Sequence, residues 1–242
     1  MPDLINNLTL MFDMQPEAAI GYFGSLGMET SWDWQEQLGI IRKHCFTISK
    51  VHSADVLQSI HDGLANALAR GDTLRDFKSG IEPYLKDKGY ARKDDGSAWR
   101  WDTIFRTNLS TAYNEGRRQE MLRVADKFPY WQYIATMDIR TRPSHAALNL
   151  VVARYDSRFW RNNPLPRGFM CRCRMRALSE DYVKQRGYKI YKDSDLIKVG
   201  NKMMPLGTVK PDKGFGGKFK PDLTRYSPAI RSEVTKILRG GK

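Results

Sequence analysis

Between positions 138 and 173, the sequence holds one group of residues whose types and spacing could support chemistry. The group comprises Asp138, Arg140, His145, Cys171 and Cys173. Two thiolates and an imidazole are ligands that Zn²⁺ prefers, and the Asp138 carboxylate could supply a fourth. The single residue between the cysteines departs from the spacing of about two to four that structural zinc sites use. The sequence therefore leaves zinc open, and favours a packed pair of reduced cysteines beside a hydrogen-bonded histidine.

The same residues allow a catalytic interpretation. His145 could act as a general base oriented by Asp138, or Cys171 could act as a nucleophile activated by His145 and nearby arginines. The sequence has no P-loop, no dinucleotide-binding glycine motif after a strand, and no H-E-x-x-H motif. We therefore expect a protein that is not an enzyme, has no small-molecule substrate and needs no cofactor, with zinc as the alternative that the cysteines leave open.

The elements that must position these residues follow from periodicity. Apolar residues spaced by three and four predict helices up to residue 90, with Ser53 and Gly71 as the cap and stop of one of them. A charged, glycine-containing linker leads to a long helix over 99–128. The pattern predicts an α+β fold in three parts: a helical N-terminal section over 1–90, a domain over 97–183 with the long helix packed on a small β-sheet, and an extended basic C-terminal arm over 184–242 ending in a short helix.

The long helix and two strands should form the core around the candidate group. We expect strands over 130–135 and 169–177, and a short helix that begins at Ser144. Alternation in the second strand should turn Cys171 and Cys173 inward, and Arg172 and Arg174 outward. The long helix should bury four apolar side chains against these strands, namely Phe105, Leu109, Ala112 and Val124.

Charge is distributed unevenly along the 242 residues, whose formal net charge is +13. Residues 1–70 contain four Lys and Arg against eight Asp and Glu, a net of −4, so the rest of the chain carries +17. Such basic segments predict a polyanionic partner, with a solvated basic surface as the alternative. The residues expected to face DNA are Arg158, Arg161, Arg167, Arg172, Arg174, Arg176, Lys218 and Lys220.

Two classes of protein are disfavoured by composition. The sequence has no apolar run of about 18 residues, which argues against a membrane span. The first residues lack a signal-peptide pattern, and three cysteines do not make a disulfide framework. We therefore expect a protein without a membrane partner that works in a cytosol-like compartment.

Several motifs, in order and at matching spacings, resemble the phage Mu protein F family of minor head, or head morphogenesis, proteins. The resemblance covers most of the chain to about residue 180. The sequence departs from the family pattern at two turns, Leu165–Gly168 and Asn149. These departures affect the expected local turn geometry and not the resemblance itself. The motifs are R-T-N-L-S-T-A-Y-N-E-G-R (Arg106–Arg117), P-Y-W-Q-Y (Pro129–Tyr133), D-x-R-T-R-P-x-H-A-A-L (Asp138–Leu148), F-W (Phe159–Trp160) and P-R-G-F-M-C-R-C-R (Pro166–Arg174).

The resemblance implies a minor capsid protein of a tailed bacteriophage, present in few copies inside the head near the portal vertex and in the host cytoplasm during assembly. Its implied partners are the portal protein, capsid or scaffold proteins, and packaged double-stranded DNA bound without sequence preference. Some relatives are ejected with the genome. The alternative is a phage-delivered nuclease or toxin-like effector, and a free DNA-binding protein with a helix-turn-helix is disfavoured because the early helices lack a basic recognition face.

Overall fold

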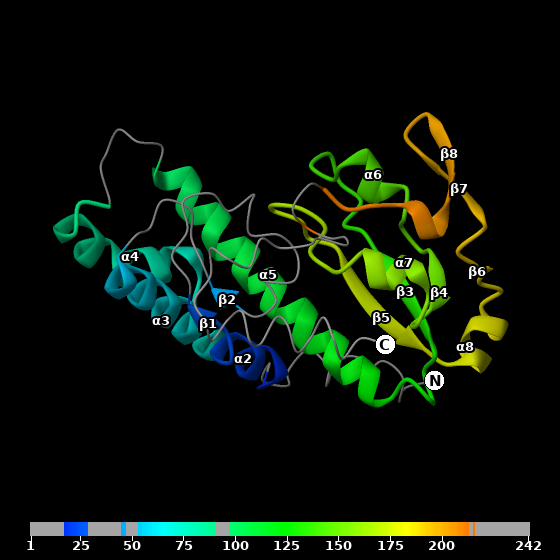
Figure 1. The fold of residues 1–242 in the computed structure, drawn as a ribbon, viewed down its shortest axis with the longest axis horizontal. Coiled ribbons are helices and arrows are strands. Elements are labelled where there is room, and N and C mark those ends of the chain that lie inside the picture. Colours follow the sequence, from blue (N-terminus) through cyan, green and yellow to red (C-terminus); the bar gives the residue numbers. More distant parts are fainter. Residues whose placement is uncertain (1–16, 29–44, 47–52, 91–96, 213–214, 216–242) are drawn as a thin grey trace, which may run out of the picture.

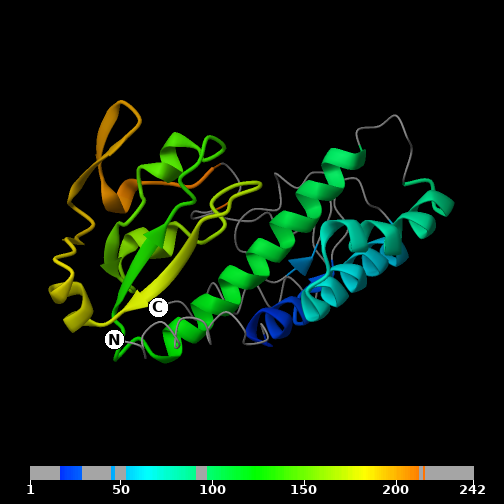
Figure 2. The same ribbon diagram turned by 180° about the vertical axis from the view of Figure 1, so that it is seen from behind.

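A computed structural model describes residues 17–28, 45–46, 53–90, 97–212 and 215 of the chain. Helices gather at one end of the molecule and a small β-sheet at the other, and one long helix runs alongside both (Figures 1 and 2). This is the α+β arrangement that the sequence predicts. No helix within the described ranges is long and apolar enough to cross a membrane.

The described part of the N-terminal section is mainly helical, as predicted, but it also contains a pair of two-residue strands that the sequence did not predict. Ser53 caps the second helix by accepting a hydrogen bond from the Val56 N–H, and Gly71 ends that helix in the left-handed conformation at φ 72°. Both signals are visible in the sequence. The elements are α2 (Glu17–Gly24), β1 (Gly27–Met28), β2 (Cys45–Phe46), α3 (Ala54–Arg70) and α4 (Leu74–Asp87), with β1 and β2 paired in parallel.

A first hydrophobic core forms where these helices meet. On α3, the apolar residues spaced by four lie inward and are at most 1% exposed, namely Val56, Ile60, Leu64 and Leu68. Side chains of α2 and α4 complete this core, and so do residues from the N-terminal half of α5 (Ser97–Arg123).

The partners of α5 differ from the sequence prediction. Phe105 and Ala112 are buried, but they pack in the helical core rather than against the β-sheet. Leu109 is only partly buried there, and Val124 is 40% exposed beyond the end of the helix. The residue of α5 that enters the core under the sheet is Met121. Periodicity identified two of the four buried positions correctly, and α2 rather than the sheet packs against α5.

The sheet has four strands in the order β5-β3-β4-β6, with β3 antiparallel to both neighbours and β4 parallel to β6. One face carries a second, aromatic-rich core that includes Trp131, Tyr133, Phe159 and Trp160. The other face carries a small cluster beneath α8. The elements are β3 (Tyr130–Ile134), α6 (Pro143–Ala146), β4 (Val152–Arg154), α7 (Arg158–Asn162), β5 (Arg174–Leu178), α8 (Glu180–Gln185) and β6 (Ile190–Tyr191).

Helix α5 contacts the segment that forms the edge of this sheet. The Ser110 hydroxyl donates to the Cys171 carbonyl at 3.2 Å, and the Arg117 guanidinium donates to the Met175 carbonyl at 3.4 Å. Met175 lies on the edge strand β5, where its carbonyl would otherwise be a free acceptor. The helix therefore fixes the position of the cysteine-containing segment as well as lying beside it.

The segment after residue 184 corrects the prediction of an extended arm. Its first part folds into β6, a hairpin of β7 (Leu196–Val199) and β8 (Lys202–Pro205), and a short 3-10 helix η2 (Leu206–Thr208). Ile197, Leu206 and Val209 enter the aromatic-rich core. The segment is rich in lysine and glycine, so the sequence pattern did not reveal the apolar residues that turn inward. The expected terminal helix lies outside the described residues.

Candidate functional site

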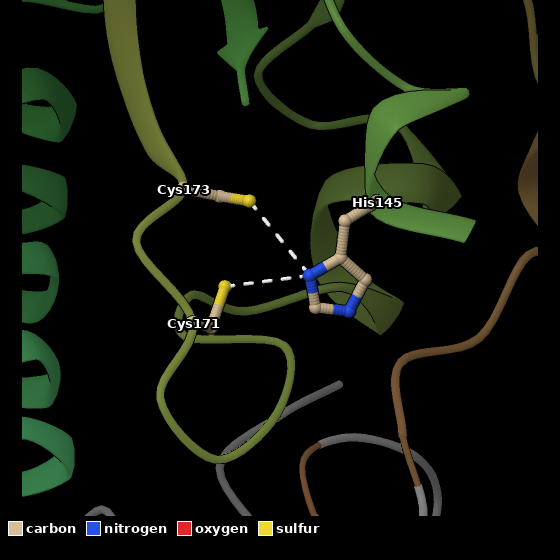
Figure 3. A group of neighbouring side chains, drawn as sticks. All are labelled: His145, Cys171 and Cys173. Carbon is tan, nitrogen blue, oxygen red and sulfur yellow. Dashed lines mark hydrogen bonds between the residues drawn. The ribbon is translucent and has the colours of Figure 1, made fainter. Parts of the chain in front are cut away.

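Three of the candidate residues meet between the sheet and α6. His145 lies on α6, and its Nδ1 is 3.6 Å from the Cys171 Sγ and 3.8 Å from the Cys173 Sγ (Figure 3). All three side chains are buried. The cysteines belong to an extended segment that precedes β5, so they lie on one side of the chain although the strand begins later than predicted.

The two cysteines differ in their acid–base properties. The hydrogen bond from the Cys173 thiol lowers the pKa of Cys171, and the hydrogen bond with His145 lowers it further, against the opposing effect of burial. The same interaction with Cys171 raises the pKa of Cys173. Burial also raises the pKa of the neighbouring Tyr133 hydroxyl. The interaction between the thiols therefore has opposite effects on the two pKa values.

Asp138 does not join this group. Its carboxylate accepts two hydrogen bonds from the Arg172 guanidinium, at 2.6 and 2.7 Å, on the exposed surface. This pairing holds the pKa of Asp138 well below its usual range. Asp138 therefore neither orients His145 nor offers a fourth ligand. The extended segment turns Arg172 outward, and the Asp138 carboxylate pairs with it at the surface. Arg140 is exposed on the same loop.

Among the residues that the structure describes, Asp212 places a carboxylate beside His145, and the sequence did not indicate this contact. Its Oδ1 lies 3.8 Å from the His145 Nε2, and its Oδ2 lies 3.2 Å from the Arg142 Nε. Gly168 makes room for it, because a Cβ at that position would collide with the Asp212 carboxylate. No spacing signal in the sequence relates Asp212 to His145, since the chain brings them together only through the folding of its later segment.

Arg167 corrects the list of arginines expected to face DNA. Its side chain is fully buried at 0% exposure. Its guanidinium donates to the Asn163 Oδ1 at 3.1 Å, the Ser144 carbonyl at 3.3 Å and the Lys210 carbonyl at 2.7 Å. It also lies over the Tyr133 ring. Arg167 therefore holds three segments together, a role that charge counting cannot distinguish from a surface charge.

The other predicted arginines lie nearer to solvent. Arg158, Arg161 and Arg174 are exposed, and Arg172 is exposed but paired with Asp138. Arg176 is half-buried and donates to the Gln132 side chain. Lys218 and Lys220 fall outside the described residues. The expected placement of the cysteines inward and of Arg172 and Arg174 outward is confirmed.

A basic seam runs where α5 meets the start of β5. Burial lowers the pKa of Arg117, and the positive charge of the neighbouring Arg174 lowers it further. Two cations held near each other favour an anion between them. The sequence did not reveal this seam, since the two residues come from different elements.

Comparisons with known proteins agree with the family resemblance that the sequence motifs indicate. Residues 58–176 match the family model described as "Phage Mu protein F like protein". The chain is 36% identical over 239 residues to "Putative capsid assembly protein F" of Escherichia phage Mu, which covers 93% of this chain and 53% of that protein. It is also 36% identical over 207 residues to "Mu-like prophage FluMu F protein" of Haemophilus influenzae, covering 82% of this chain and 49% of that protein.

The chain thus spans about half the length of the curated relatives it matches. A comparison with solved structures found no match.

Proposed function

The chain belongs to the phage Mu protein F-like family, and from this premise we propose that it is a minor head protein that assists capsid assembly in a tailed bacteriophage. The observation that carries the proposal is the alignment of nearly the whole chain with a relative named as a capsid assembly protein. In this proposal the protein acts by binding and not by catalysis. It is placed inside the head near the portal vertex and in few copies.

The buried cluster supports a role without catalysis. Cys171 is 5% exposed and His145 is 2% exposed, so a macromolecular substrate could not reach a nucleophile there without opening the core. The Asp138 carboxylate that the sequence offered as a partner for His145 is bound by Arg172, and the Asp212 carboxylate near His145 is paired with Arg142. The cluster is therefore better suited to holding α6 and the β5 segment together than to attacking a substrate.

We further propose that the basic surface contacts packaged DNA. Exposed Arg158, Arg161 and Arg174, with the seam of Arg117 and Arg174, offer contacts to phosphates, which carry no sequence information. The acidic N-terminal section is then suited to a protein partner such as the portal or the capsid, because its net charge would be repelled by DNA. Ejection with the genome would follow from the same location.

Particle composition tests the assembly role. Mass spectrometry of purified, nuclease-treated phage heads should detect peptides of this chain at a small, fixed ratio to the major capsid protein. Disruption of the gene should yield fewer filled heads, and the intact gene supplied in trans should restore them. Absence of the chain from heads and from assembly intermediates, with normal head yield after disruption, would refute the proposal.

DNA binding should be independent of sequence and steeply dependent on salt. Replacing Arg158, Arg161 and Arg174 together with Gln should make the slope of log affinity against log salt shallower, by about 0.9 for each phosphate that the protein no longer neutralises. The measurement is a salt titration of duplex binding by fluorescence anisotropy, using two unrelated sequences. The matched control replaces three basic residues of the helical section, Arg70, Arg75 and Lys78, and should leave the slope unchanged. Equal slopes for the native chain and the first variant would mean that these arginines touch no DNA.

A further inference from the structure

We propose that His145, Cys171 and Cys173 bind a Zn²⁺ ion through one nitrogen and two sulfur atoms. The ligand atoms of the three residues all lie within 4.8 Å of one another. Figure 3 shows both sulfurs directed at the same nitrogen, Nδ1, from the segment before β5, with His145 approaching from α6. The site does not depend on the assembly role, since it rests on these atoms alone.

The distances fit tetrahedral coordination. With Zn–S near 2.3 Å and Zn–N near 2.0 to 2.1 Å, a tetrahedral ion separates its nitrogen and sulfur ligands by about 3.5 to 3.6 Å. The observed Nδ1–Sγ distances are 3.6 Å to Cys171 and 3.8 Å to Cys173. The two nitrogen–sulfur separations therefore need to change by no more than a few tenths of an ångström to accept an ion.

The imidazole can form a full hydrogen bond with only one of the two sulfurs that lie near its Nδ1. A neutral imidazole Nδ1 offers either one N–H or one lone pair, so it cannot make full hydrogen bonds with two thiols at once. A zinc ion placed between the three atoms would satisfy both sulfurs and the nitrogen together. The two thiolates would also neutralise its charge in a buried site, where an unpaired charge is costly.

The surroundings of His145 supply a second observation. Its Nε2 is buried and has no hydrogen-bond partner among the described residues, while the Asp212 Oδ1 lies 3.8 Å away. A histidine that ligates a metal through one nitrogen usually donates its other N–H to a carboxylate. A small rotation of either side chain would complete that contact, and Gly168 leaves the space that Asp212 occupies.

Zinc is the metal that this donor set favours. Two thiolates and an imidazole are soft to borderline ligands, which select Zn²⁺ over Mg²⁺ or Ca²⁺. Among the residues that the structure describes, no fourth His, Cys, Asp or Glu joins the group. We assign the fourth coordination position to a water molecule, so the ion has two sulfur ligands and one nitrogen ligand from the protein.

The whole chain, freed of any affinity tag, provides the decisive measurement. Elemental analysis of protein purified without chelators should find one zinc per chain, and X-ray absorption should find two sulfur neighbours. After removal of zinc, Co²⁺ alone should give the intense visible absorption of tetrahedral thiolate coordination, and zinc should displace it. Protein that carries no zinc and gives no such absorption with Co²⁺ would overturn the proposal without any variant.

Matched variants test the ligand set. Cys173→Ser and His145→Gln should each lose the bound zinc, whereas Cys45→Ser and Asp138→Asn should keep one zinc per chain. Should a ligand variant fail to fold, the sulfur count of the native protein still decides. Three sulfur neighbours, or loss of zinc from Cys45→Ser or Asp138→Asn, would show that the assigned ligand set is wrong.

Discussion

Replacing Gly116 with Ala should destabilise the protein, although the same change in an open helix stabilises it. A Cβ at Gly116 would lie 2.6 Å from the Ala19 N and 2.8 Å from the Ala18 carbonyl carbon, both in the backbone of α2. A backbone cannot move aside as a flexible side chain can, so α2 must shift away from α5. Overpacking of this kind costs about 1 to 3 kcal/mol, and it exceeds the gain of up to about 1 kcal/mol from replacing a helical glycine with alanine.

Gly80 provides the matched control. It lies in α4, and an added Cβ would meet nothing within 4 Å. Gly80→Ala should therefore raise the free energy of unfolding by about 0.5 to 1 kcal/mol. Urea denaturation followed by circular dichroism measures both variants. If Gly116→Ala stabilised the protein as Gly80→Ala does, the close approach of α2 to α5 would not restrict the side chain at position 116. Gly116→Leu would then leave α2 in place.

Replacing Arg167 with Ala should cause a large loss of stability. The change removes three hydrogen bonds and leaves the Asn163 side chain and the Ser144 and Lys210 carbonyls without their donor. Each buried acceptor left unsatisfied costs about 1 to 3 kcal/mol. We therefore expect a loss on the order of 4 kcal/mol or more, together with a cavity beside Tyr133.

Two further variants separate the role of the hydrogen bonds from that of charge. Arg161→Ala removes an exposed arginine nearby and should change the free energy of unfolding by less than about 0.5 kcal/mol. Arg167→Lys keeps the charge but cannot reach three acceptors in the plane of a guanidinium, so it should recover only part of the loss. Full recovery by lysine would mean that Arg167 acts through its charge alone. Limited proteolysis should also detect release of the segment around Lys210, whose neighbour Asp212 donates its N–H to the Arg167 carbonyl.

Local signals in the sequence predicted local structure well. Ser53, Gly71 and the spacing of apolar residues on α3 depend on interactions within a few residues, so the sequence alone determined them. The grouping of His145 with Cys171 and Cys173 was also predicted, because few other residues could form such a group. The alternation of inward and outward side chains before β5 held even though the strand begins after Cys173.

What could not be predicted depends on contacts between distant segments. Arg167 and Arg174 look alike in the sequence, but one is buried among carbonyls and the other is exposed. Asp138 is nearer to His145 in sequence than Asp212 is, yet the Arg172 guanidinium holds it at the surface. The face of α5 that binds α2 was visible as a periodic pattern, but periodicity does not show which element packs against that face.

The position of α5 also has a consequence for how the protein unfolds. The helix begins among the residues of the helical core, with Trp101 and Phe105, and enters the aromatic-rich core at Met121. Helix formation is cooperative, so unwinding α5 in one core weakens its remaining turns in the other. We therefore expect the two cores to unfold in a single transition, without a populated state in which only one of them is open. All-or-none unfolding of this kind keeps partly folded forms, and the aggregation they cause, rare.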